Sequence, residues 1–166
     1  MNNAFLPDEQ QLCAARILII DDEDTYVQAV DWFLRQAKFR NLRGLTRSTE
    51  ALEEFRKFNP DLVILDLHMP EVDGFALLKQ LREAVPPGEF LPLLAMTGYS
   101  AADTRSRALE AGANDFLPKP FDKSEVLLRI RNLLQTRLLF LEARDARTRL
   151  EALAAPGAGS VASSKH

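Results

Sequence analysis

Short apolar runs alternate with stretches of helical spacing between about residues 16 and 135. The two strongest runs, Ile17–Ile20 and Leu62–Leu65, are continuously apolar, which is typical of strands buried on both faces. A weak strand is expected at about residues 41–45, and further strands at Leu91–Met96 and Asn114–Leu117. Strands that alternate with helices predict a parallel sheet covered on both sides. We therefore expect an α/β fold of the flavodoxin-like, doubly wound type, with five strands in the order 2-1-3-4-5.

These patterns divide the chain into four parts. They are a flexible N-terminal arm (residues 1–15), an α/β domain (16–135), a helical extension (136–155) and a disordered tail (156–166). The arm has no clear hydrophobic period, and the tail after Pro156 is rich in Gly, Ala and Ser, a composition that does not build a core.

Composition excludes some classes of partner. The net charge is −3 and the charges are mixed along the chain, so we expect no direct binding of nucleic acid, which needs a basic face. No apolar run approaches the roughly 20 residues of a membrane helix, so we expect no membrane insertion. The only cysteine, Cys13, lies in the predicted arm and has no disulfide partner in the chain. A reducing, cytoplasmic location is therefore expected.

Polar side chains follow four of the five predicted strands. They are, in chain order, Asp21, Asp22 and Glu23, then Asp66, Thr97 and Lys119. In doubly wound sheets, ligands bind at the carboxyl ends of the strands. The first and third strands are neighbours in the expected order, so their acids converge and repel one another unless a cation lies among them. Mg²⁺ prefers such oxygen ligands. Each group alone has an ordinary explanation: the acidic triplet as a helix start, Thr97 as part of a turn and Lys119 as a surface lysine. Their joint placement at one edge of the sheet predicts a site.

The predicted chemistry is transfer of a phosphoryl group. Asp66 is placed to act as a carboxylate nucleophile that forms an acyl phosphate. Stabilising the transferred group requires positioning and positive charge. The Lys119 ammonium can neutralise one outer oxygen of this group, and the Thr97 hydroxyl can donate a hydrogen bond to another.

Five segments carry a resemblance to a known family: Ile19–Glu23, Leu65–Pro70, Asp73-Gly74, Met96–Gly98 and Lys119–Phe121. In this order and spacing, over about 16–134, the chain resembles the response-regulator receiver domain of two-component signalling systems. The resemblance implies that a histidine kinase or a phosphotransfer protein, or a small phosphodonor, passes a phosphoryl group to Asp66.

The resemblance also implies a metal site and a cis peptide. Asp22 and Asp66 would bind Mg²⁺ directly, Asp21 through water, and His68 through its backbone carbonyl. The His68 side chain would lie at the mouth of the site, where an effect on the dephosphorylation rate remains an alternative. The peptide bond between Lys119 and Pro120 would be cis.

The resemblance further implies a conformational switch. Thr97 would move towards the phosphoryl group, and Phe116 would turn inwards to fill the vacated space. The family often has Tyr at the position of Phe116, so the hydroxyl hydrogen bond that such a tyrosine makes is absent here.

The end of the chain predicts a long helix. Nothing breaks the helical pattern from Ser124 to about residue 155, a length of about 45 Å. Apolar residues step along it by four and three: Leu139, Ala143, Ala146, Leu150 and Leu153. This heptad-like seam predicts a parallel coiled coil or helix pair that forms a homodimer. The alternatives are a helix folded back on its own domain or one that frays after about residue 142.

We expect a signalling module rather than an enzyme. Residues 127–137 are similar to the linker helix that joins receivers to cyclic-dinucleotide enzymes, so one alternative is a fragment of a longer regulator whose output domain, such as a cyclic-dinucleotide phosphodiesterase, is absent. A stand-alone receiver that acts by docking is another. An aspartyl-phosphate phosphohydrolase is disfavoured because its second acid is replaced by His68. A degenerate receiver is disfavoured because the acids, Thr97 and Lys119 are all present.

Overall fold

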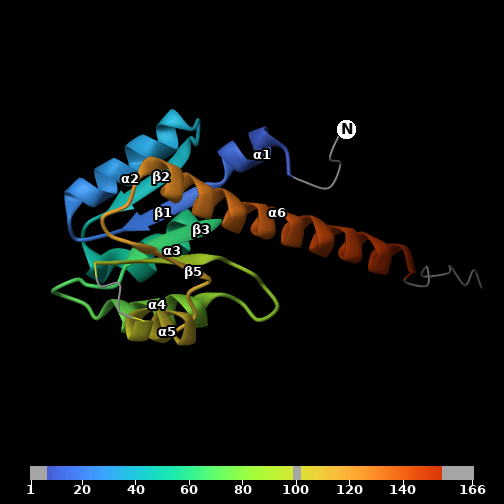
Figure 1. The fold of residues 1–166 in the computed structure, drawn as a ribbon. Helices are drawn as coiled ribbons and strands as arrows, with labels where there is room; N and C mark the ends of the chain where they lie inside the picture. Colours follow the sequence, from blue (N-terminus) through green and yellow to red (C-terminus); the bar gives the residue numbers. More distant parts are fainter. Residues whose placement is uncertain (1–6, 99–101, 155–166) are drawn as a thin grey trace, which may run out of the picture.

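The computed structural model describes residues 7–98 and 102–154 and contains a five-stranded sheet (Figure 1). The strands are β1 (Arg16–Ile20), β2 (Asn41–Leu45), β3 (Leu62–Asp66), β4 (Leu93–Thr97) and β5 (Asp115–Pro118). All neighbouring strands are parallel, in the order β2-β1-β3-β4-β5. The predicted fold class and strand order are therefore confirmed.

Helices cover both faces of this sheet. They are α1 (Glu9–Ala14), α2 (Asp24–Gln36), α3 (Ala51–Phe58), α4 (Gly74–Ala84), α5 (Ala102–Glu110) and α6 (Lys123–Ala154), with a short 3-10 helix η1 (Ser48–Glu50) before α3. One core packs α1, α2 and α6 against one face of the sheet, and the second packs α3, α4 and α5 against the other. Successive residues of β1 alternate between the two cores, because side chains on a strand point to opposite faces. The central strands β1, β3 and β4 are thus apolar except for one residue at an end of each. Among the described residues, none of the helices is long and apolar enough to cross a lipid bilayer.

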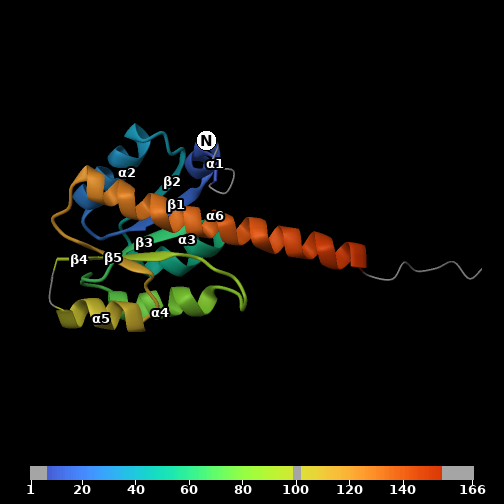
Figure 2. The same ribbon diagram turned by 45° about the vertical axis from the view of Figure 1, so that its right-hand side comes forward.

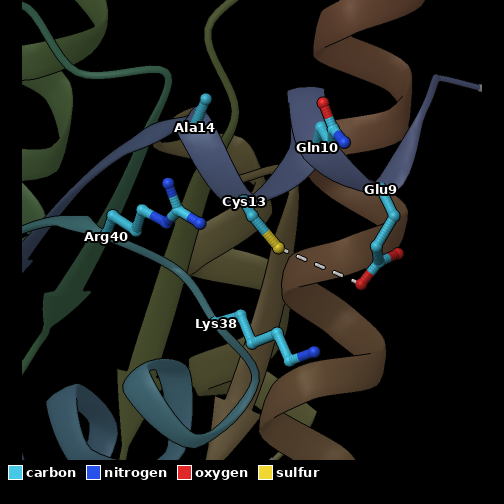
Figure 3. Close-up of a pocket in the computed structure, with 6 residues that line it drawn as sticks. All are labelled: Glu9, Gln10, Cys13, Ala14, Lys38 and Arg40. Carbon is cyan, nitrogen blue, oxygen red and sulfur yellow. Dashed lines mark hydrogen bonds between the residues drawn. The ribbon is translucent and has the colours of Figure 1, made fainter.

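Residues 9–14 differ from the prediction of a flexible arm. They form α1, in which Leu12 and Cys13 are buried, and Glu9 makes an ion pair of 2.7 Å with Arg131 of α6. The Cys13 sulfur lies 3.6 Å from the carbonyl oxygen of Ala37 and faces a cavity between α1 and the start of β2 (Figure 3). A helix of six residues is too short to show a hydrophobic period, and packing on α6 stabilises it. The arm prediction is wrong for this segment; residues 1–6 lie outside the described residues.

The last helix, α6, is longer than the domain needs. Val126, Ile130 and Leu134 are buried against the sheet, whereas residues 142–154 are exposed along their whole length. Figures 1 and 2 show this second part projecting away from the sheet as one continuous helix. The prediction of an unbroken helix is confirmed up to Ala154, and the predicted tail (156–166) lies outside the described residues.

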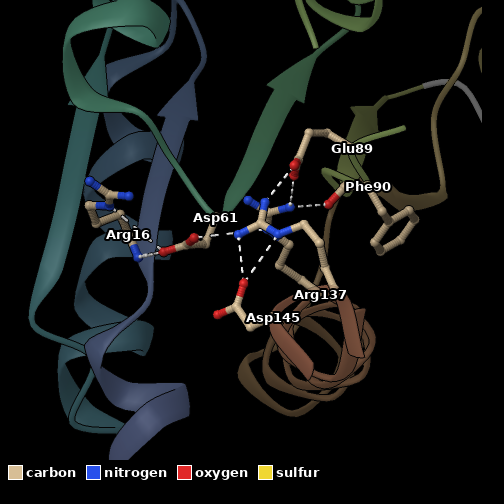
Figure 4. A network of polar contacts seen from close by, with 7 residues as sticks. Arg16, Asp61, Glu89, Phe90, Arg137 and Asp145 are labelled. Carbon is tan, nitrogen blue, oxygen red and sulfur yellow. Dashed lines mark hydrogen bonds and ion pairs between the residues drawn. The ribbon is translucent and has the colours of Figure 1, made fainter. Parts of the chain in front are cut away.

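Arginines hold α6 to the loop between α4 and β4 where it leaves the domain (Figure 4). Arg137 donates a hydrogen bond to the carbonyl oxygen of Phe90 and lies 3.3 Å from a Glu89 carboxylate oxygen. Arg144, two turns later, pairs with the same carboxylate. The ring of Phe140 packs on that of Phe90, with centroids 6.0 Å apart. We call these five residues the α6 clamp.

Gly74 at the start of α4 fixes how this helix meets the end of β3. A β-carbon at this position would lie 2.5 Å from the Cα atom of Leu67, closer than packed atoms can approach. We therefore expect Gly74→Ala to lower the free energy of unfolding by about 1–3 kcal/mol, measured by urea denaturation. Gly98→Ala is the matched control, because among the described residues no atom lies within 4 Å of its β-carbon position. Equal losses in both variants would contradict this account.

Candidate functional site

Three carboxylates meet at the carboxyl edge of the sheet. Asp21 directly follows β1 and Asp66 ends β3, and the two strands are hydrogen-bonded neighbours. Oxygen atoms of Asp21, Asp22 and Asp66 all lie within 4.8 Å of one another. Asp21 and Asp66 are 0% and 1% exposed, so these charges lie in a poorly solvated environment. The structure thus brings together the acids that the sequence placed at two neighbouring strand ends.

Lys119 places a positive charge among these acids. It follows β5, and its backbone N–H donates to the carbonyl oxygen of Thr97 at 2.7 Å. Its ammonium nitrogen lies 2.7 Å from an Asp21 oxygen and 3.3 Å from an Asp66 oxygen. The peptide bond that follows, to Pro120, is cis, as the resemblance implied. Lys119 is therefore a buried counter-ion of the acidic cluster.

The electrostatics of the cluster leave excess negative charge. Burial raises the pKa of Asp21, and the hydrogen bond from Lys119 offsets this only in part. Burial tends to lower the pKa of Lys119, but its bond with Asp21 and the charge of Asp66 outweigh burial and raise it. The buried Oδ1 atom of Asp22 has no hydrogen-bond partner among the described residues. Three acids, one ammonium and an unsatisfied carboxylate oxygen fit a hard divalent cation with oxygen ligands.

A cavity of about 360 Å³ opens beside Asp66 and Lys119. His68 lies on its wall, and the Nδ1 atom of His68 is 3.4 Å from the Thr97 hydroxyl. This agrees with the expected position of the His68 side chain at the mouth of the site. The role of the His68 carbonyl as a ligand stays a prediction. The cavity has room for a small anionic group beside the Asp66 carboxylate and the Lys119 ammonium, which both line it.

Phe116, the predicted switch residue, lies outside this cavity. The guanidinium of Arg105 from α5 is 4.7 Å from the centre of its ring, and that of Arg129 from α6 is 5.6 Å from it. Asp115 accepts two hydrogen bonds of 2.9 Å from Arg129. Phe116 is thus held between two cations.

Two considerably larger cavities lie away from these acids in the described part of the chain. One of about 540 Å³ lies beside α1 (Figure 3), and one of about 600 Å³ lies between the α3–β3 loop and α6. Both open at the amino ends of strands and contain no cluster of acids like that around Asp66. The cavity beside Asp66 and Lys119 is therefore the better candidate for a functional site, although it is smaller.

Comparison with known proteins decides the family. The family model of the response regulator receiver domain matches residues 17–131. The chain belongs to this family. Receivers are the signalling domains of two-component systems. In general, receiver domains receive their signal from histidine kinases and bind Mg²⁺.

Several relatives of this receiver are response regulators. It is 39% identical over 139 residues to response regulator MprA of Mycobacterium ulcerans, a match that covers 80% of this chain and 56% of that protein. The receiver spans about half the length of the curated relatives that it matches.

Solved structures show the same fold. A putative response regulator from Chloroflexus aurantiacus superposes with a TM-score of 0.67 at 36% identity, over 73% of this chain and 98% of the other. NtrX from Brucella abortus gives a TM-score of 0.74 at 31% identity, over 82% of this chain and 30% of NtrX. A response regulator with a GGDEF domain matches at 27% identity, with a TM-score of 0.71 over 78% of this chain and 52% of its own.

The sequence analysis of this receiver missed Tyr26. The centre of its ring lies 3.8 Å from the Lys119 ammonium nitrogen and 5.7 Å from the centre of the Phe121 ring. Tyr26 also lines the site cavity. Tyr26 comes three residues after Glu23, in the first turn of α2, and therefore lies at the same edge of the sheet as the acids. That spacing was the available signal.

Proposed function

We propose that this receiver accepts a phosphoryl group on Asp66 from the phosphohistidine of a histidine kinase or phosphotransfer protein, with Mg²⁺ as cofactor. The observation that carries the proposal is the buried Asp66 carboxylate beside the Lys119 ammonium and two further acids. Under this proposal the chain is a phosphate-accepting signalling module that assists only its own phosphorylation and dephosphorylation. The acid that a phosphohydrolase would need two residues after Asp66 is replaced by His68.

The residues of the site divide the chemistry among them. An oxygen of Asp66 attacks phosphorus, the phosphorus–nitrogen bond to the donor histidine breaks, and an acyl phosphate forms. Lys119 neutralises one outer oxygen of the transferred group, and the Thr97 hydroxyl donates a hydrogen bond to another. Asp22, Asp66 and the His68 carbonyl would hold Mg²⁺ directly and Asp21 through water; when bound, this ion supplies positive charge to the third oxygen.

The conformational output involves Thr97 and Phe116. Movement of Thr97 towards the new phosphoryl group leaves space that the Phe116 ring fills by turning inwards. In the present structure Arg105 and Arg129 hold this ring in place. We infer that these two cation–π contacts replace the hydroxyl hydrogen bond of a tyrosine as the restraint on the switch.

We further propose that the receiver is part of a longer regulator or acts through docking, and that its α6 extension forms a homodimer. The curated relatives are about twice as long as the match, and one solved neighbour joins its receiver to a GGDEF domain. Such an output domain would be the effector, and direct binding of nucleic acid is not expected of the receiver itself. A cytoplasmic location also stays a prediction.

Asp66→Asn should abolish phosphorylation. Incubation with Mg²⁺ and acetyl phosphate should add one phosphoryl group per wild-type chain, seen by intact-protein mass spectrometry as one acid-stable, base-labile adduct. The amide of the variant is a far weaker nucleophile, so the adduct should disappear, while Asp103→Asn in α5 should keep it. An adduct that persists in Asp66→Asn would place the acceptor elsewhere.

Mg²⁺ should stabilise the receiver against heat. A ligand that binds only the folded state adds about 2.7 kcal/mol at a hundredfold excess over its Kd. We expect Asp22→Asn to lose most of the Mg²⁺-dependent rise in Tm, since Asp22 supplies an unsatisfied oxygen. Asp103→Asn should keep the full rise. The same rise in all three proteins, measured by calorimetry, would exclude binding at this cluster.

Arg105→Ala should move the switch without phosphorylation. Losing one cation–π contact of about 0.5–1 kcal/mol should raise the population of the inward Phe116 ring about two- to fivefold. The population can be followed by NMR of ¹³C-labelled phenylalanine, with beryllium fluoride defining the inward state. Arg107→Ala is the matched control, because Arg107 lies on the same helix but over Phe75. Identical Phe116 signals in wild type and Arg105→Ala would refute the restraint.

A further inference from the structure

The α6 extension has two different faces. One face, formed by Arg137, Phe140 and Arg144, contacts Glu89 and Phe90 in the α6 clamp. Figure 4 shows Arg137 between Glu89 and Phe90. The receiver therefore holds the extension by a defined side, and the helix is not folded back along its remaining length. The other faces of residues 142–154 are exposed.

The apolar seam lies opposite the α6 clamp. Its members are Leu139, Ala143, Ala146, Leu150 and Leu153. Consecutive residues of an α-helix are turned by about 100°, which gathers the seam within about 80° and separates its centre from the clamp side chains by about 100–160°. Leu150 and Leu153 are 67% and 83% exposed. A second helix can therefore cover the seam without displacing the clamp.

Charged residues flank the seam with opposite signs. In heptad terms Leu139, Ala146 and Leu153 occupy d positions, which places Glu142 at g and Arg147 at e. In a parallel, in-register pair, the g residue of one helix faces the e residue five positions later in the other. Glu142 of each copy would then face Arg147 of the second copy.

The leucines decide between parallel and antiparallel pairing. A parallel pair places every seam residue against its own counterpart, so Leu139, Leu150 and Leu153 all meet leucine. An antiparallel pair that matches Leu139 with Leu150 brings Leu153 against Thr136, a polar side chain. Of these two arrangements, the parallel one buries Leu153, the most exposed leucine of the described residues, against another leucine.

We propose that two copies of this chain associate through the α6 extension as a parallel, in-register coiled coil, with Glu142 of each copy paired with Arg147 of the other. The inference rests on the proposed homodimer and adds its orientation, register and specificity. The small residues Ala143 and Ala146 at the centre let the two helices approach closely. Both receivers then lie at the same end of the coiled coil, each held by its own clamp.

Sedimentation equilibrium of the full chain at tens of micromolar tests the interface. We expect a dimer, and Leu150→Lys should raise its dissociation constant at least about tenfold, because the lysine opposes itself in the seam. Circular dichroism checks that the helix is retained. A monomeric wild type, or a dimer that Leu150→Lys leaves unchanged, would overturn both the α6 homodimer and the pairing. Neither result bears on phosphorylation of Asp66, which is read by mass spectrometry.

Charge variants test the orientation. Glu142→Arg and Arg147→Glu should each weaken the dimer about three- to tenfold, and the double variant should restore it, since the opposite charges are then exchanged. Arg149→Glu is the matched control: in a parallel pair it faces Ala154, whereas in an antiparallel pair it faces Glu142. A dimer weakened by Arg149→Glu but not by Arg147→Glu would overturn the parallel pairing while leaving the homodimer standing.

Discussion

The ammonium of Lys119 is the interaction on which the functional edge of this receiver depends. It lies between the carboxylates of Asp21 and Asp66, where water has little access. Without it, two buried negative charges would face each other in a medium that screens them poorly. One ammonium cannot neutralise three acids, so the edge remains negative. This remaining negative charge suits a hard divalent cation with oxygen ligands.

The parallel sheet is what allows such a cluster to form. Its central strands are buried on both faces by two apolar cores, which fix their register. Parallel strands end at the same edge, so residues distant in sequence, such as Asp21 and Lys119, meet there without any local contact. Burial of the apolar side chains thus offsets the electrostatic cost of burying the acids. The middle of each central strand stabilises the fold, and its carboxyl end carries the site.

The sequence was informative where structure follows from local pattern. Continuous apolar runs predicted the central strands, and polar residues after them predicted the acidic edge. Contacts between distant segments could not be predicted where no strand end or motif marks the residues. Helix α1 is too short to show a period, and its partner Arg131 lies far along the chain. Glu89 is likewise distant from Arg137 and lies in a loop without a recognisable motif. Tyr26 looked like one more helical residue, because nothing local shows that its ring contacts Lys119.

Helix α6 connects the two ends of the sheet. It begins just after Lys119 and Pro120 at the acidic edge, packs along one face of the sheet, and meets Glu89 at the opposite end. A helix has a continuous hydrogen-bond ladder and does not stretch, so a displacement at its start must be taken up at the far end. There the α6 clamp holds it by ion pairs to Glu89, a hydrogen bond to the Phe90 carbonyl and ring packing on Phe90. A shift of the segment around Lys119 would therefore act on the same helix that carries the clamp and the exposed extension.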